Sequence, residues 1–212
     1  MEHAFWHSRW ESNQIGFHAA QENPLLVRHI GALSINKGAR VFLPLCGKSL
    51  DIHWLLARGF QVAGIELSDI AVKQLFEDLN LNPVVREIGS ISHYSAENID
   101  IFAGDIFDLT PQTLGPIDAI YDRAALVALP ATMRPDYAAQ LAELGKAAPQ
   151  LVICFEYDQS AVAGPPFSID AAQMHALYSA HYRLTDLETV AVPNGLKGIY
   201  PATETAWLLT RS

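Results

Sequence analysis

Two residues, Gly47 and Glu66, have the types and the spacing of a nucleoside-binding site. Gly47 lies in a loop, residues 44–49, between a predicted strand and a predicted helix. Glycine lets the backbone approach a ligand closely, and a helix N-terminus offers free N–H groups. Glu66 ends the next predicted strand about 20 residues later, where a carboxylate reaches the hydroxyls of a bound ribose. A solvated strand end is the other interpretation of Glu66, but the strand–loop–helix–strand context favours the ribose role.

The loop also indicates which nucleoside it could bind. A dinucleotide site needs G-x-G-x-x-G because a pyrophosphate rests on the backbone, and this loop has only Gly47. Gly47, Lys48 and Ser49 match the end of a phosphate loop, with Asp122 as a candidate magnesium carboxylate, but Phe42 stands where that motif needs its first glycine. S-adenosylmethionine has no phosphate, so one glycine and one acidic residue suffice. A phosphate-loop NTPase and a non-catalytic nucleoside-binding module remain as alternatives of another class.

Alternating strands and helices must position these residues. Strands are predicted at residues 39–45, 61–67, 83–87, 117–123, 150–158, 184–192 and 204–210, with a polar hairpin around 93–99 and a further strand ending near 105. Helices are predicted at 49–59, 68–80 and 169–180, and a further helix begins at residue 133 and must stop before Pro149. This order is typical of an α/β fold with a mostly parallel sheet and helices on both faces. No helix fits between the last two strands, so we expect them to pair antiparallel, as in the Rossmann-like class I methyltransferase fold.

Composition restricts the class of protein. The 212 residues suit a single domain, 1–212, and half of them are hydrophobic. A net charge of −9 makes nucleic acid a poor candidate partner. No apolar run reaches the length of a membrane span and the first residues do not resemble a signal peptide, so we expect a cytoplasmic protein. Cys46 and Cys154 are expected to be buried thiols, and His3 and His7 lack the partners of a metal site.

The chain resembles the thiopurine S-methyltransferase family over nearly its whole length. The resemblance rests on the ordered segments WHSRWESNQIGFH, VFLPLCGKS, GIELS, GDIFDL, YDRAALVAL, GPPF and ETAWLLT. It implies a monomeric methyltransferase that uses S-adenosylmethionine, no metal and a small thiol acceptor, with residues 1–23 as an N-terminal lid segment. By the same resemblance, the cofactor contacts are Trp10, Leu45, Glu66 and Arg123, with Asp105 and Ile106 near the adenine. The substrate-binding residues would be Phe17, Pro166 and Phe167.

The residues themselves support part of this assignment. Trp6 and Trp10 are i,i+4 neighbours on a short predicted helix. We assign Trp6 to packing and Trp10 to the cofactor, where an indole near a sulfonium gains about 1 kcal/mol. Arg123 ends a predicted strand and could bind the cofactor carboxylate with two parallel hydrogen bonds; pairing with Asp122 or Glu66 is its alternative role. Arg123 is also a candidate catalytic residue, because a positive charge near the acceptor sulfur would raise the fraction of thiolate. Asp122 is the second candidate catalytic residue, as a support for Arg123 or as a proton acceptor.

The expected chemistry is in-line attack by an aromatic or heterocyclic thiolate on the methyl group of S-adenosylmethionine. Heteroaromatic thiols are already acidic, so the reaction needs no strong base from the protein. The alternative acceptors are selenium or tellurium species and other small thiols.

Overall fold

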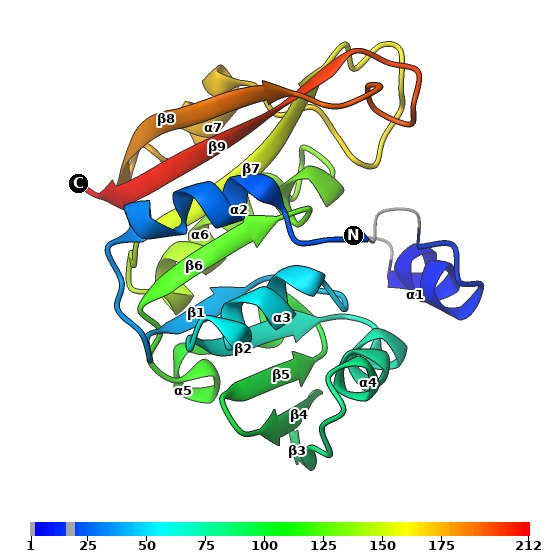
Figure 1. The fold of residues 1–212 in the computed structure, drawn as a ribbon, viewed down its shortest axis with the longest axis vertical. Coiled ribbons are helices and arrows are strands. Elements are labelled where there is room, and N and C mark those ends of the chain that lie inside the picture. Colours follow the sequence, from blue (N-terminus) through cyan, green and yellow to red (C-terminus); the bar gives the residue numbers. More distant parts are fainter. Residues whose placement is uncertain (1–2, 16–19) are drawn as a thin grey trace.

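One mixed β-sheet forms the centre of the molecule (Figure 1). The computed structural model describes residues 3–15 and 20–212. Within them the strand order is β3-β4-β5-β2-β1-β6-β7-β9-β8. The bounds are β1 Arg40–Leu43, β2 Gln61–Glu66, β3 Val84–Ile88, β4 Ile91–Ala96, β5 Ile99–Ala103, β6 Ala119–Arg123, β7 Gln150–Tyr157, β8 Tyr182–Ala191 and β9 Ala202–Arg211. The five central strands β5, β2, β1, β6 and β7 are parallel, whereas both edges are antiparallel, which confirms the predicted final strand pair.

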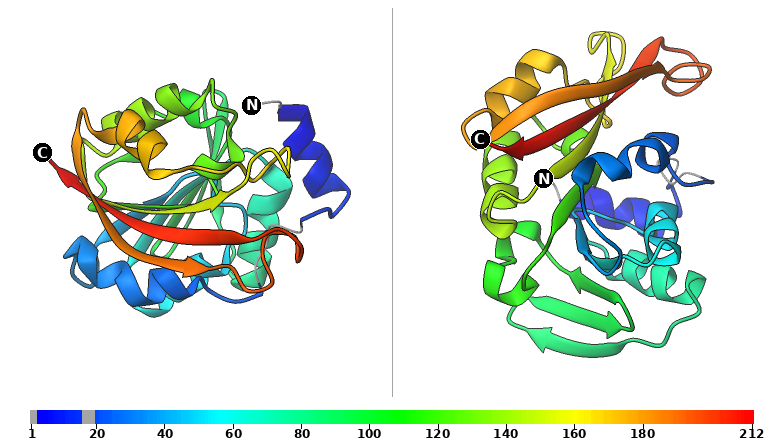
Figure 2. Two further views of the ribbon diagram at one scale, coloured as in Figure 1. Left: turned by 90° about the horizontal axis from the view of Figure 1, so that it is seen from above. Right: turned by 60° about the vertical axis from the view of Figure 1, so that its left-hand side comes forward.

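Helices cover both faces of this sheet (Figures 1 and 2). One face carries α2 (Pro24–His29), α3 (Leu50–Ala57) and α4 (Asp69–Asp78), and the other carries α5 (Pro111–Leu114), α6 (Arg134–Leu144) and α7 (Ala171–Tyr178). Short 3-10 helices in the described part of the chain are η1 (Ile30–Leu33), η2 (Ile106–Asp108) and η3 (Leu126–Ala128). The first helix, α1 (His3–Glu11), stands apart, beside the carboxyl ends of the parallel strands.

The central strands are apolar throughout because both of their faces are covered. In β1, Phe42 packs with the core under α6, while Val41 and Leu43 pack with the core under α3. Successive side chains of a strand point to opposite faces, so a strand between two helical layers needs apolar residues at every position. This explains why the segment lacks the apolar–polar alternation of a half-exposed strand.

Two serines begin the helices that follow β1 and β2, as their positions predict. Ser49 Oγ accepts a hydrogen bond from Asp51 N at 3.2 Å, and Ser68 Oγ accepts one from Ala71 N at 3.4 Å. These caps satisfy N–H groups that the first helical turn leaves without a partner. The two helices therefore begin at the sheet edge where the candidate site lies.

One predicted helix boundary is wrong. The helix predicted from residue 133 to just before Pro149 already ends at Leu144, because Lys146 and Ala147 have left-handed backbones with φ of 50° and 57°. A helix cannot continue through residues in that conformation. The turn that results leads directly into β7.

The segment before β1 contains α2 and η1, which the periodicity of the sequence does not predict. Asn23 caps α2 through its side chain, which accepts from Leu25 N at 2.8 Å. The buried Asp51 carboxylate accepts from Asn23 N at 2.7 Å and from the Tyr121 hydroxyl at 2.9 Å. This carboxylate therefore joins the N-terminal segment to α3 and β6.

No helix in residues 3–15 and 20–212 is long and apolar enough to cross a membrane. Across the same residues, no three His, Cys, Asp or Glu side chains gather where they could hold a metal ion.

Candidate functional site

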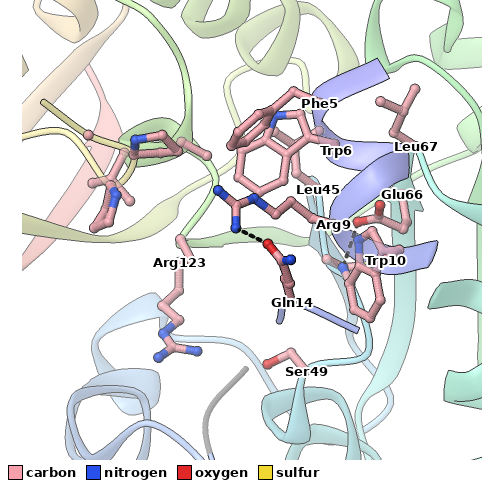
Figure 3. A pocket seen from close by; sticks show the side chains of 18 of the residues that line it. Phe5, Trp6, Arg9, Trp10, Gln14, Leu45, Ser49, Glu66, Leu67 and Arg123 are labelled. Carbon is pink, nitrogen blue, oxygen red and sulfur yellow. Dashed lines mark hydrogen bonds between the residues drawn. The ribbon is translucent and has the colours of Figure 1, made fainter. Parts of the chain in front are cut away.

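A cavity of about 660 Å³ opens at the carboxyl edge of the parallel strands (Figure 3). Its volume lies within the usual range for small-molecule sites, and in open α/β sheets ligands bind at this edge. The ends of β1, β2 and β6 form the floor of the cavity. Side chains of α1, the N-terminal helix, cover it. The described lining residues are Phe5, Trp6, Arg9, Trp10, Gln14, Leu45, Cys46, Gly47, Lys48, Ser49, Glu66, Leu67, Arg123, Ala124, Val127, Ala128, Phe155, Gly164, Pro165, Pro166, Leu196 and Lys197.

Glu66 and Gly47 meet at one end of this cavity, as their spacing predicts. One oxygen of the Glu66 carboxylate accepts from Gly47 N at 2.8 Å, and the other accepts from Ser68 N at 2.9 Å. Burial raises the pKa of Glu66, and these backbone N–H groups act in the opposite direction. The carboxylate is only 6% exposed and keeps unshared lone pairs that can accept from two neighbouring hydroxyls.

Trp10 closes the cavity over Gly47. Its side chain is 5% exposed, and a Cβ placed on Gly47 would lie 3.3 Å from Trp10 Cζ2. Gly47 has a left-handed backbone with φ of 53°, and so has Leu45, two residues earlier, with φ of 45°. Leu45 is not a glycine, so its conformation is strained, as is common where a loop is shaped for a ligand. The indole therefore packs directly against the glycine turn, where a larger residue would not fit.

The loop is poorly suited to a phosphate. Lys48 Nζ is 3.2 Å from the Asp78 carboxylate, so its charge is already paired. The N–H of Gly47 points at the Glu66 carboxylate, whose negative charge would repel an anion. These contacts disfavour the phosphate-loop alternative.

Arg123 lies at the end of β6, across β1 from Glu66 (Figure 3). Its guanidinium forms no ion pair or hydrogen bond with any residue that the structure describes, including Asp122 and Glu66. The next residue, Ala124, has a left-handed φ of 62°, which turns the chain sharply after Arg123. The five donors of Arg123 are therefore available to an acidic group in the cavity.

Asp122 lies in the core rather than on the cavity wall. It is fully buried, and its carboxylate accepts from the Tyr137 hydroxyl at 2.7 Å and from Leu126 N at 3.1 Å. Burial raises the pKa of Asp122 to about 6, although both hydrogen bonds favour the charged form. These contacts hold the turn that carries Arg123 and Ala124, which favours the supporting role over that of proton acceptor.

The two residues of the GPPF segment that are predicted to bind the methyl acceptor have different positions in the structure. Pro166 lines the cavity, together with Pro165. Phe167 does not: its ring packs against Gly164, where a Cβ would lie 2.5 Å from Cδ1, and it sits 5.4 Å below the Arg134 guanidinium carbon. Phe167 N also donates to Val127 O at 2.6 Å. Phe167 therefore fixes the loop that presents the prolines.

Asp105 and Ile106 follow β5 at the same sheet edge, beyond Glu66, but neither lines the cavity. Asp105 accepts from Phe107 N at 3.0 Å and pairs with His3 Nε2 of α1 at 2.9 Å. Ile106 is buried in the core. Phe17, the remaining predicted acceptor residue, lies outside the residues that the structure describes.

Several lining residues are not predicted by the sequence motifs. Phe5 and Arg9 extend from α1 into the cavity, and the Arg9 guanidinium carbon lies 4.9 Å from the Phe5 ring centroid. Phe155 comes from β7, and Lys197 from the loop between β8 and β9. The i,i+4 spacing of Phe5 and Arg9 could have indicated their contact. Nothing in the sequence places Phe155 or Lys197 beside them.

The cavity thus has two chemically different ends. The end at β1 and β2 offers one glycine turn, one buried carboxylate and an indole, which suits an adenosyl group. The end beyond β6 is lined mainly by apolar side chains, namely Val127, Ala128, Phe155, Pro165, Pro166 and Leu196. A group that bridges the two ends would pass Arg123.

Comparisons with known proteins find relatives that match the whole chain. The model of the family described as thiopurine S-methyltransferase (TPMT) matches residues 1–212. A protein of Xanthobacter autotrophicus named thiopurine S-methyltransferase is 54% identical, with 100% of both chains covered. A protein of Gluconobacter oxydans with the same name is 53% identical over 96% of this chain and 92% of its own.

Solved structures show the same fold at low identity. One is the 1,6-didemethyltoxoflavin-N1-methyltransferase of Burkholderia thailandensis, which holds 1,6-didemethyltoxoflavin and S-adenosylhomocysteine. Its TM-score is 0.68 at 16% identity, covering 98% of this chain and 87% of that one. The magnesium protoporphyrin IX methyltransferase of Synechocystis, with bound S-adenosylhomocysteine, has a TM-score of 0.63 at 14% identity with both chains fully covered.

Proposed function

The chain belongs to the thiopurine S-methyltransferase family and is an S-adenosylmethionine-dependent methyltransferase, and we propose that it methylates the sulfur of aromatic and heterocyclic thiols, thiopurines among them. The family and the cofactor are the premises of this proposal. The thiol acceptor is inferred from the chemistry of the cavity.

The observation that carries the proposal is the lack of a general base among the described lining residues. Glu66 is the one carboxylate there, and both of its oxygens already accept backbone hydrogen bonds. Cys46 is the one lining thiol, and burial raises the pKa of that thiol. An acceptor that must lose a proton before it attacks the methyl group must therefore arrive as an anion or lose that proton to water. Thiols on heteroaromatic rings ionise near neutral pH, whereas alcohols do not.

The residues of the cavity divide the work of binding and alignment. S-adenosylmethionine supplies a methyl group on a sulfonium, and its transfer to a thiolate leaves two neutral sulfurs. Glu66 would hold the ribose hydroxyls, and Arg123 the carboxylate of the methionine part. Val127, Phe155 and Pro166 would exclude water from the acceptor end, which disfavours separated charges more than the neutralising transition state. Holding both partners in line supplies much of the remaining acceleration.

Residues 1–23 act as a lid in this proposal. The described part of this segment places Trp10 over Gly47 and the rings of Phe5 and Trp6 above the cavity, with their centroids 5.2 Å apart. The His3–Asp105 pair connects the start of α1 to the loop after β5. A lid attached in this way would shield the reacting sulfurs from water once the cofactor is bound.

The acceptor is tested by comparing 6-mercaptopurine with its oxygen analogue hypoxanthine, with selenite and with a small aliphatic thiol, while formation of S-adenosylhomocysteine is measured. We expect turnover of 6-mercaptopurine and none of hypoxanthine, because the two differ only in the nucleophilic atom. Faster turnover of selenite or of the aliphatic thiol would replace the proposed acceptor with that alternative. Methylation of hypoxanthine at a comparable rate would contradict the requirement for an acidic nucleophile.

A further inference from the structure

The charged residues of the cavity are mostly cationic, although the chain carries a net charge of −9. The described lining residues with a full charge are Arg9, Lys48, Glu66, Arg123 and Lys197. Three of these have a partner or an assigned role at the cofactor end. Lys48 is paired with Asp78, Glu66 is held by backbone N–H groups, and Arg123 faces the methionine part in the proposed function. Arg9 and Lys197 remain without a carboxylate partner among the described residues.

Arg9 is held in place without being neutralised. Its Nη1 donates to Gln14 Oε1 at 2.6 Å, and its guanidinium carbon lies 4.9 Å from the centroid of the Phe5 ring. Both partners are uncharged, so the positive charge of Arg9 is not cancelled, and one side-chain acceptor leaves most of its five donors unused. In Figure 3 its side chain extends from α1 across the cavity, toward the side on which Arg123 lies.

Lys197 lines the same cavity but comes from the opposite part of the chain. It lies in the loop between β8 and β9, which is fixed by a hydrogen bond from Leu196 N to Tyr200 O at 2.7 Å. This loop requires Gly195, where a Cβ would lie 2.2 Å from the Tyr200 oxygen. The ammonium of Lys197 makes no ion pair or hydrogen bond within the described part of the chain. A tight turn therefore presents an unpaired cation at the cavity.

We propose that Arg9 and Lys197 form an anion subsite at the mouth of the acceptor end, which selects ring thiols that carry a carboxylate or a similar anionic substituent. This inference rests on the proposed function, since it names a subclass of the same acceptors. A ring between the apolar walls would place its thiol toward the cofactor and its opposite edge toward the mouth. There an anionic substituent meets two cations, and charge-assisted hydrogen bonds are stronger than neutral ones. A carboxamide of the same shape would gain much less binding free energy from these two cations, because it is uncharged.

The test is the affinity of two unreactive, nearly isosteric ligands for the protein saturated with S-adenosylhomocysteine. These are 4-(methylthio)benzoate and 4-(methylthio)benzamide, titrated by calorimetry. We expect the benzoate to bind about tenfold more tightly than the amide at low salt, and this ratio to fall toward one in Arg9→Gln and in Lys197→Gln. Arg9→Lys keeps the charge and should retain part of the preference. Arg86→Gln, which removes an exposed arginine on the distant edge strand β3, should leave the ratio unchanged.

Equal affinities for the two ligands, or a ratio that neither substitution changes, would overturn the anion subsite. The same variants are then assayed for methyl transfer to 4-mercaptobenzoate and 4-mercaptobenzamide. A binding preference without transfer to either thiol would support the subsite and remove the proposed function. Transfer to both thiols with equal efficiency in every variant would support the proposed function and remove the anion subsite.

Discussion

Glu66, at the end of β2, accepts a hydrogen bond from the backbone N–H of Gly47, which follows β1, at an O···N distance of 2.8 Å. This contact joins the loops of two neighbouring parallel strands at the edge where their carboxyl ends meet. It orients the carboxylate and shapes the glycine turn at the same time. The preformed arrangement explains how one acidic residue and one glycine can recognise a nucleoside without a phosphate cradle.

Replacing Gly47 by alanine should weaken the binding of S-adenosylhomocysteine by about tenfold. The added Cβ would lie 3.3 Å from Trp10 Cζ2 on a backbone with φ of 53°, so the indole or the loop must shift. Left-handed backbone costs a non-glycine residue roughly 1–2 kcal/mol. Calorimetric titration measures the loss, and a change in tryptophan fluorescence would report the displaced indole.

Gly89→Ala is the matched control for this variant. Gly89 also has a left-handed backbone, with φ of 63°, but a Cβ there meets no atom within 4 Å. Its substitution should lower the stability to a similar extent and leave ligand affinity unchanged. Equal losses of affinity in the two variants would show that strain, and not the contact with Trp10, explains the effect.

Arg123→Gln should discriminate between two ligands. S-adenosylhomocysteine has an amino-acid carboxylate, whereas 5′-methylthioadenosine ends in a methyl group. If Arg123 binds that carboxylate, the substitution lowers the affinity for S-adenosylhomocysteine by about tenfold or more. It lowers the affinity for 5′-methylthioadenosine very little. Competition binding of both ligands to wild type and variant measures this difference. An equal loss of affinity for both ligands would show that Arg123 contacts the nucleoside part or supports the fold, and does not bind the carboxylate.

Asp122 should make the stability of the protein depend on pH in a predictable direction. Burial raises the pKa of Asp122 from an ordinary value of 3.8 to about 6. A raised pKa in the folded state means that folding favours the protonated carboxyl, so its contribution is complete below pH 3.8 and is lost as pH rises through 6. The loss amounts to roughly 3 kcal/mol if the pKa shift is fully expressed.

Urea unfolding of wild type and Asp122→Asn from pH 4 to pH 8 tests this dependence. The difference in free energy of unfolding between the two proteins should change between pH 4 and pH 6.5 and then stay constant, because other groups titrate equally in both. Tyr137→Phe removes a hydrogen bond to the charged carboxylate at 2.7 Å and should move the transition to higher pH. Parallel curves of unfolding free energy against pH for all three proteins would refute the raised pKa of Asp122.

The sequence predicts those parts of the site that depend on local pattern. Apolar runs place the ends of β1, β2 and β6, and Ser49 and Ser68 have the positions of helix caps. Because parallel strands end at the same edge, these local signals are enough to bring Gly47 and Glu66 together.

Residues that depend on packing between distant segments could not be predicted. Phe167 follows two prolines of the cavity wall, yet its ring packs against Gly164 and under the guanidinium of Arg134 in α6. Arg9 and Lys197 are separated by most of the chain and line one cavity only once α1 and the last hairpin are folded. No periodicity or spacing records such proximity, since it follows from tertiary packing alone.

The most direct measurement is the affinity of S-adenosylhomocysteine and 5′-methylthioadenosine for Glu66→Gln, with Glu77→Gln on the exposed face of α4 as the control. Each hydrogen bond to a charged group contributes about 1.5–3 kcal/mol, so loss of the ribose contacts should weaken both ligands by roughly 100-fold. The control should bind both ligands as wild type does. A folded Glu66→Gln protein that binds either ligand with wild-type affinity would contradict the account.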